Sequence, residues 1–114
     1  MRTYHFTTGT GTPALNLVSA TGCAFLGMAA TCAEAAAYFV KIWWGGTAAG
    51  TELPVIGTTA PNLTIQVPTT GTFQEFNHPL QGGGPMWVAA TKNAGDTDDT
   101  ALTTGGDVIS LFVD

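Results

Sequence analysis

Turn-forming residues interrupt this chain at short intervals, and that spacing limits the folds it can adopt. Glycine, proline and asparagine favour turns, and the first two also interrupt helices. Short apolar runs separated in this way are typical of an antiparallel sandwich or barrel rather than of alternating strands and helices. The turn clusters lie at 8–13, 45–46, 60–62, 68–71, 81–85, 93–95 and 105–107.

The apolar runs between these clusters have the pattern of strands. In Leu63–Val67 every second residue is apolar, which is the period of a strand with one wet face. Met86–Ala90 and Val108–Val113 are almost continuously apolar, as expected for central strands covered on both faces. We therefore predict an all-β fold, a single antiparallel β-sandwich over residues 1–114.

Two segments leave a choice open. Ala29–Tyr38 is rich in alanine and also suits a helix, because alanine and glutamate are good helix formers. Residues 1–13 become polar and rich in Gly and Thr after Phe6, so they form an arm that orders against a neighbour, a frayed terminus or an edge strand.

The charge of the chain excludes several classes of partner. Its net charge is −5, and only 10% of its residues are charged, against about 25% in a typical soluble domain. Three fixed cations argue against binding to nucleic acid or to an anionic membrane surface. The apolar stretch Gly22–Trp44 contains Glu34 and Lys41, so we do not expect it to span a membrane. A surface this poor in charge suits one that a protein partner covers.

The cysteines and histidines do not form a recognisable catalytic or metal-binding pattern. Cys23 and Cys32 lie among apolar residues, and we expect buried free thiols, with a disulfide as the alternative. His5 and His78 have no second ligand at metal-binding spacing. We expect no catalytic residue, no metal site and no cofactor.

The acidic stretch 93–100 (NAGDTDDT) is the best remaining candidate for chemistry. Asp96, Asp98 and Asp99 have oxygen ligands that suit calcium. An EF-hand loop counted from Asp96 fails, because Ala101 stands where glycine is needed and Asp107 where glutamate is needed. Another kind of calcium site and an acid pair for glycoside hydrolysis remain alternatives. We expect a solvated turn that contacts a neighbouring subunit.

The run Tyr38–Trp44 suggests a surface rather than a site. As a strand it places Phe39, Lys41 and Trp43 on one face, and we expect this face to be outward because lysine is rarely fully buried. Three interpretations remain: a second apolar layer of the same domain, a protein contact, or a platform for stacking sugars. Tyr4 and Phe6 are further candidates for a protein contact.

The order of these segments resembles the small virion proteins of tailed bacteriophages. The resemblance covers most of the chain from about Leu15 and depends on segment order, not on a catalytic signature. Its segments are Tyr38-x-Val40-Lys41, Thr51-x-x-Pro54-Val55, Gly84-Pro85-Met86-Trp87-Val88-Ala89, Asp96-Thr97-Asp98 and the closing strand Val108–Val113.

The resemblance implies a jelly-roll-like β-sandwich that decorates or cements a phage head. Such a protein is not an enzyme. It binds the lattice of the major capsid protein on the outer surface of the virion, stabilises the head, and associates with itself as a homodimer or homotrimer. The resemblance also implies a strand, not a helix, over Gly22–Ala33. The alternatives are a carbohydrate-binding or host-receptor-binding module using Trp43, Trp44 and Trp87, and a small hydrolase using the acidic stretch.

Overall fold

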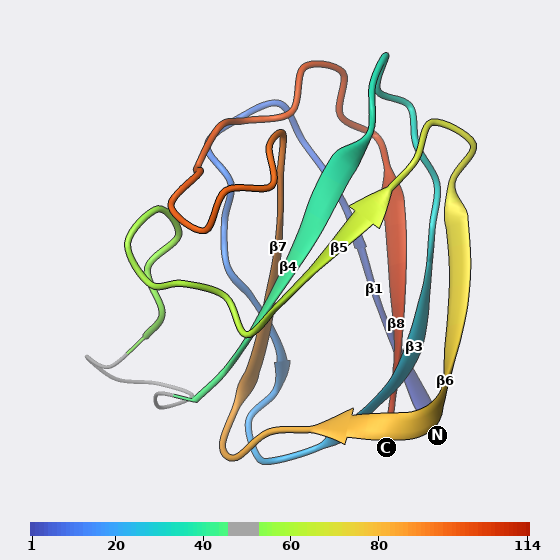
Figure 1. Ribbon diagram of the computed structural model, residues 1–114, viewed down its shortest axis with the longest axis vertical. Coiled ribbons are helices and arrows are strands. Elements are labelled where there is room, and N and C mark those ends of the chain that lie inside the picture. Colours follow the sequence, from blue (N-terminus) through green and yellow to red (C-terminus); the bar gives the residue numbers. More distant parts are fainter. Residues whose placement is uncertain (46–52) are drawn as a thin grey trace.

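The computed structural model describes residues 1–45 and 53–114, and in this part of the chain it contains strands and no helix (Figure 1). The prediction of an all-β fold is confirmed. Thr51, which begins the Thr-x-x-Pro-Val segment, lies outside the described residues. The strands are β1 (Arg2–Thr7), β2 (Asn16–Ser19), β3 (Ala24–Ala30), β4 (Tyr38–Trp44), β5 (Leu63–Val67), β6 (Thr72–Gln81), β7 (Met86–Thr91) and β8 (Val108–Val113).

The strands form two antiparallel sheets, with the orders β1-β8-β3-β6 and β2-β7-β4-β5. Strands pair in nested fashion from the two ends of the chain: β1 with β8, β2 with β7, β3 with β6 and β4 with β5. Nested antiparallel pairs that are divided between two packed sheets define a jelly roll, so the predicted jelly-roll-like sandwich is confirmed. The two chain ends lie side by side (Figure 1).

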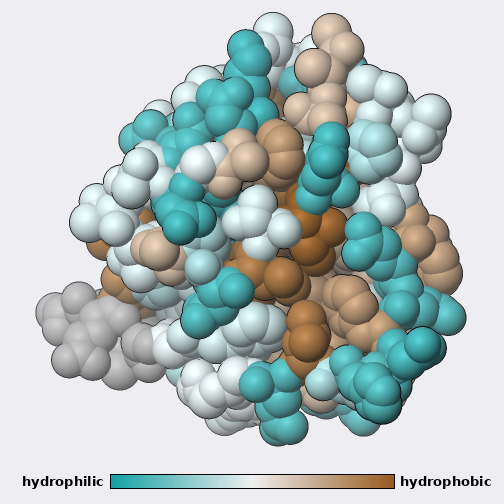
Figure 2. Space-filling model, in the orientation of Figure 1, coloured by the Kyte–Doolittle hydropathy of each residue, from teal (hydrophilic) through white to brown (hydrophobic). Residues whose placement is uncertain are grey.

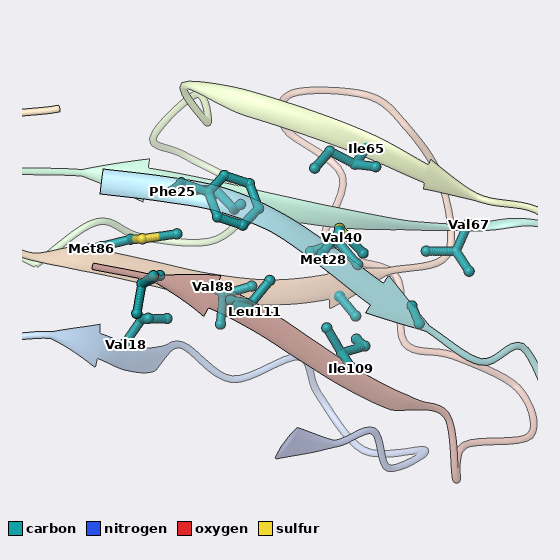
Figure 3. Packing of buried hydrophobic residues seen from close by; sticks show 14 of the residues in the cluster. Val18, Phe25, Met28, Val40, Ile65, Val67, Met86, Val88, Ile109 and Leu111 are labelled. Carbon is teal, nitrogen blue, oxygen red and sulfur yellow. The ribbon is translucent and has the colours of Figure 1, made fainter. Parts of the chain in front are cut away.

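The main core lies between the two sheets. Phe25 and Met28 of β3 and Leu111 of β8 meet Val40 of β4 and Val88 of β7 (Figure 3). All six residues of β7 are buried, as its continuous apolar run predicts. The same prediction is wrong for β8, because its outward residues are not buried: Val108 is exposed, and Ser110 and Phe112 are half-buried. Nothing in an apolar run itself says whether a second layer will cover it.

The N-terminal residues are an edge strand rather than an arm. All six residues of β1 pair with β8, from Arg2 opposite Val113 to Thr7 opposite Val108. The alternative of an edge strand therefore describes Arg2–Thr7, and the stretch between Thr7 and the start of β2 lacks strand structure. Both cysteines are free, as expected, although Cys32 is half-buried rather than buried.

The alanine-rich segment after β3 is not a helix, because polar contacts hold it in another conformation. Glu34 accepts hydrogen bonds from the backbone N–H groups of Thr103, Thr104 and Gly105 at 2.9–3.0 Å. The fully buried Asp107 carboxylate accepts a hydrogen bond from the Ala33 N–H at 2.6 Å. These contacts tie the segment to the stretch before β8, and they replace the backbone bonds that a helix would make.

Candidate protein-binding surface

The acidic stretch 93–100 is an ordered loop between β7 and β8. The carboxylate of Asp98 accepts hydrogen bonds from the backbone N–H groups of Asn93 and Thr100 and from both of their side chains, at 2.7–3.2 Å. Partial burial alone would raise the pKa of Asp98, but these hydrogen bonds outweigh it and lower the pKa. Asp96 and Asp99 are exposed. Within the described residues, no group of three or more His, Cys, Asp or Glu side chains is placed to hold a metal ion.

Lys41 lies beneath this loop, so its predicted exposure is wrong. Its side chain is 0% exposed, and its ammonium donates hydrogen bonds to the backbone oxygens of Gly95 at 2.6 Å and Asp98 at 3.1 Å. Burial lowers the pKa of Lys41, and the neighbouring Asp98, Asp96 and Asp99 oppose that effect. The acidic loop therefore supplies the polar partners that the lysine would otherwise find in water.

The tryptophans on the same outer face are also covered. Trp43 is 1% exposed and Trp87 5% exposed, and their indole N–H groups donate to the backbone oxygens of Thr59 and Gly45. Leu15, Leu17 and Ile56 pack against them in a second, smaller core. Of the three interpretations of Phe39, Lys41 and Trp43, the second apolar layer is confirmed, and the exposed face that the other two require is not present. Phe39 itself is half-buried.

The remaining predicted residues point into the sandwich. Tyr4 and Phe6 are opposite the buried Leu111 and Ile109 across the β1–β8 pair, and both are half-buried against the main core. Their rings lie 6.3 Å apart, centroid to centroid. They therefore do not share a surface with the acidic loop or with Phe39.

No segment among residues 1–45 and 53–114 covers the outer face of the β1-β8-β3-β6 sheet, and we call it the open face. Residues opposite each other in antiparallel strands point to the same side, so one row across the sheet contains Phe73, Ala29, Ser110 and His5. Phe112 lies in the adjacent row, and its ring centroid is 6.0 Å from that of Phe73. Phe73 is 65% exposed, although it lies within a strand.

A hollow beside Phe73 makes the open face uneven. It has a volume of about 630 Å³ and is lined by Ala29, Gly71, Phe73, Val108 and Ser110, among others. The projecting phenyl ring and the small residues next to it form a knob and a depression. Among the outward-facing residues of these strands, Glu75 alone carries a fixed charge. A nearly uncharged and uneven face with Phe73 and Val108 exposed is suited to a protein contact.

Sequence reasoning missed the open face, although a signal for it was present. Phe73 and Phe76 are three residues apart in a run with the period of a strand, so they must point to opposite faces. Phe76 does pack against Phe25 in the core, with ring centroids 5.1 Å apart, which leaves Phe73 outside. What the sequence does not show is that none of the described loops folds over this sheet.

Comparisons of this chain with protein-family models, with curated proteins and with solved structures found no match. The described residues contain no helix that is long and apolar enough to cross a membrane.

The hydrogen bonds of Asp98 predict a pH dependence of stability. Because its pKa is lower in the folded chain than in the unfolded chain, the carboxylate stabilises the fold above about pH 4. That contribution should disappear as the pH falls through the folded-state pKa. We expect Asp98→Asn to lower the free energy of unfolding at pH 7, and its difference from the wild-type protein to shrink as the pH is lowered from about 5 to 3.

Urea denaturation at several pH values measures this effect. Asp96→Asn is the control, since it removes one negative charge from an exposed position in the same loop. If the free energies of unfolding of Asp98→Asn and the wild-type protein differ by the same amount at every pH, the ionised Asp98 carboxylate does not stabilise the fold as proposed.

Proposed function

We propose that this chain is a non-enzymatic structural protein of a bacteriophage virion. It binds the lattice of the major capsid protein on the outer surface of the head and stabilises that head, as a decoration or cement protein does. The observation that carries the proposal is the open face, a nearly uncharged sheet surface with Phe73 exposed on its edge strand β6. The resemblance of the segment order to small phage virion proteins points to the same class.

The asymmetry between the two sheets supports a role in binding. The chain covers the outer face of β2-β7-β4-β5 with its own loops and buries Trp43, Trp87 and even Lys41 there. It leaves Phe73 and Val108 exposed on the other sheet. A domain that covers one face in this way, yet leaves large apolar side chains exposed on the other, is suited to a partner that supplies the missing layer.

The energetics of such a contact are sufficient for a cement. An interface of standard size buries about 800 Å² on each partner. At about 25 cal/mol per Å² of apolar area, several kcal/mol remain after the costs of association. Because a lattice repeats the contact many times, a modest free energy at each copy adds up to a large resistance of the head to internal pressure.

The carbohydrate-binding alternative has less support. Sugar stacking requires an aromatic face open to solvent, and the rings of Trp43 and Trp87 are covered by the chain itself. Trp44 is half-buried beside the glycine-rich turn before β7, and an added Cβ at Gly82 would overlap its ring. These three side chains do not provide a flat platform.

A change to the open face tests the proposal. Purified wild-type protein should bind phage heads that lack it and raise the temperature at which they release DNA. Phe73→Asp should weaken binding at least about tenfold, because a charge would be desolvated in the apolar contact. It should leave the fold intact, since Phe73 is mostly exposed. Co-sedimentation with heads measures binding, and thermal denaturation of the free protein checks the fold.

Val55→Asp is the matched control. Val55 is also an exposed apolar residue, 54% exposed, but it lies in the segment between β4 and β5 and not on the open face. It should bind heads like the wild-type protein. If the wild-type protein does not bind heads, the proposed function is wrong. If Phe73→Asp binds as well as Val55→Asp, the open face is not the contact.

A further inference from the structure

The strand β5 is an unprotected sheet edge. It pairs with β4 on one side and is the last strand of its sheet. Exposed edges are usually blocked by lysine, proline, a bulge or a covering segment, because their free N–H and C=O groups can pair with another strand. The five residues of β5 contain no charge and no proline, and its pairing with β4 shows no bulge.

The other edge strands of the described residues differ from β5. The strand β6 contains Glu75, His78 and Pro79, and its pairing with β3 is bulged. The strand β2 has four residues and a register shift of its own. In β1, the first residue Arg2 directs its guanidinium towards the backbone oxygen of Val18 in β2, at 3.3 Å. Of the four edges, β5 is the one with a regular, uncharged backbone.

An apolar slot opens beside this edge, between β5 and β6. It has a volume of about 580 Å³, and its apolar lining includes Leu63, Ile65 and Phe76. Figure 2 shows apolar surface in the middle of the view, alongside β5. The remaining lining residues, such as Thr64, Gln66 and Gln74, carry no charge. An occupant of this side of the sandwich must therefore bring a neutral strand and apolar side chains.

We propose that the occupant is a second copy of this chain, whose β5 pairs antiparallel with β5 about a two-fold axis at Ile65. In this register Leu63 lies opposite the partner's Val67, and Ile65 lies opposite the partner's Ile65. Thr64 on the polar face lies opposite the partner's Gln66. Apolar residues therefore meet apolar residues, and polar residues meet polar ones. The two sheets join into one continuous sheet across the dimer.

Three features favour a second copy over another partner. A two-fold axis places each residue close to the same residues of the partner, so a charged edge would repel itself, and β5 has no charge. The register pairs all five residues of β5, and Pro68 marks its end because proline cannot donate to a ladder. The apolar slots of both copies meet beside the axis, where each copy covers the half-buried Leu63 and Phe76 of the other.

A disulfide test reports both the pairing and its register. Opposite residues in an antiparallel pair have Cα atoms about 4.5–5.5 Å apart, within reach of a disulfide, whereas diagonal residues are about 7–8 Å apart. In a Cys32→Ser background, a mixture of Thr64→Cys and Gln66→Cys chains should form a cross-linked dimer under mild oxidation. Either variant alone should form little cross-linked dimer, because the introduced thiols of its two copies would be diagonal to each other.

Sedimentation of the wild-type protein should give the mass of a dimer. Gln66→Lys should raise the protein concentration needed for dimer formation at least tenfold, because lysine at an edge opposes pairing. Asn77→Lys places the same charge on the exposed edge of β6 and should leave the dimer unchanged. A monomer at every attainable concentration, or equal cross-linking of the mixture and the single chains, would overturn the inference. This result is independent of Phe73 and of head binding.

Discussion

Gly27→Ala should destabilise the protein by about 3 kcal/mol, because residue 27 has room for no side chain. Gly27 lies at the register shift of β3, with a φ of +154° that L side chains rarely adopt. A Cβ there would overlap the backbone carbonyl oxygen of Gln74 in the paired strand β6. Because the Cβ position is fixed by the β3 backbone and the carbonyl oxygen belongs to the β6 backbone, β6 must move away and the β3–β6 pairing must weaken.

The matched control is Gly9→Ala. Gly9 is exposed, and an added Cβ would meet no atom within 4 Å. Its effect should stay within about 0.5 kcal/mol. Urea denaturation followed by tryptophan fluorescence measures both variants, since Trp43 and Trp87 are buried. Equal stability of the two variants would contradict the close approach of β3 and β6 at this position.

Lys41→Met should lower the free energy of unfolding by about 2 kcal/mol. The methionine keeps an unbranched apolar stem, but it removes the ammonium that binds the backbone oxygens of Gly95 and Asp98. Charged hydrogen bonds contribute about 1.5–3 kcal/mol each, and unpaired buried carbonyls are costly. Relief of the desolvation that lowers the pKa of Lys41 offsets part of this loss.

Lys92→Met is the control for Lys41→Met. It removes the same charge from an exposed lysine near the start of the same loop, so we expect an effect within about 0.5 kcal/mol. Hydrogen exchange adds a local measurement: the amides of the acidic loop should exchange faster in Lys41→Met than in Lys92→Met. Unchanged exchange in both variants would show that Lys41 does not hold the loop.

The two proposed surfaces lie on different parts of the sandwich. The open face belongs to the β1-β8-β3-β6 sheet, whereas the β5 edge belongs to the other sheet. A dimer joined through β5 would therefore leave both open faces free. Two open faces in one dimer would allow it to contact two capsid subunits at once, which raises avidity without any new contact.

The acidic stretch illustrates how far sequence reasoning reaches. Its composition predicts a turn, and Asp98 does bond to nearby backbone as such residues do. Its role as a cover for Lys41 was not predictable. Gly95 and Lys41 are 54 residues apart, and only the pairing of β4 with β7 brings the loop over β4. The expectation that lysine faces water failed because backbone oxygens replaced the water.

The sequence by itself determined the class of fold and strands such as β5, β7 and β8. Strands and turns depend on local backbone geometry, and the apolar period and turn residues that favour this geometry lie close together in the sequence. Only the tertiary structure decided which outer face is covered. Trp43 is covered by the loop between β4 and β5, and Lys41 by the loop between β7 and β8. Both loops fold back over the β2-β7-β4-β5 sheet. The other sheet receives no such cover from the described residues, so Phe73 stays exposed. That choice depends on contacts between residues distant in sequence, which no local pattern records.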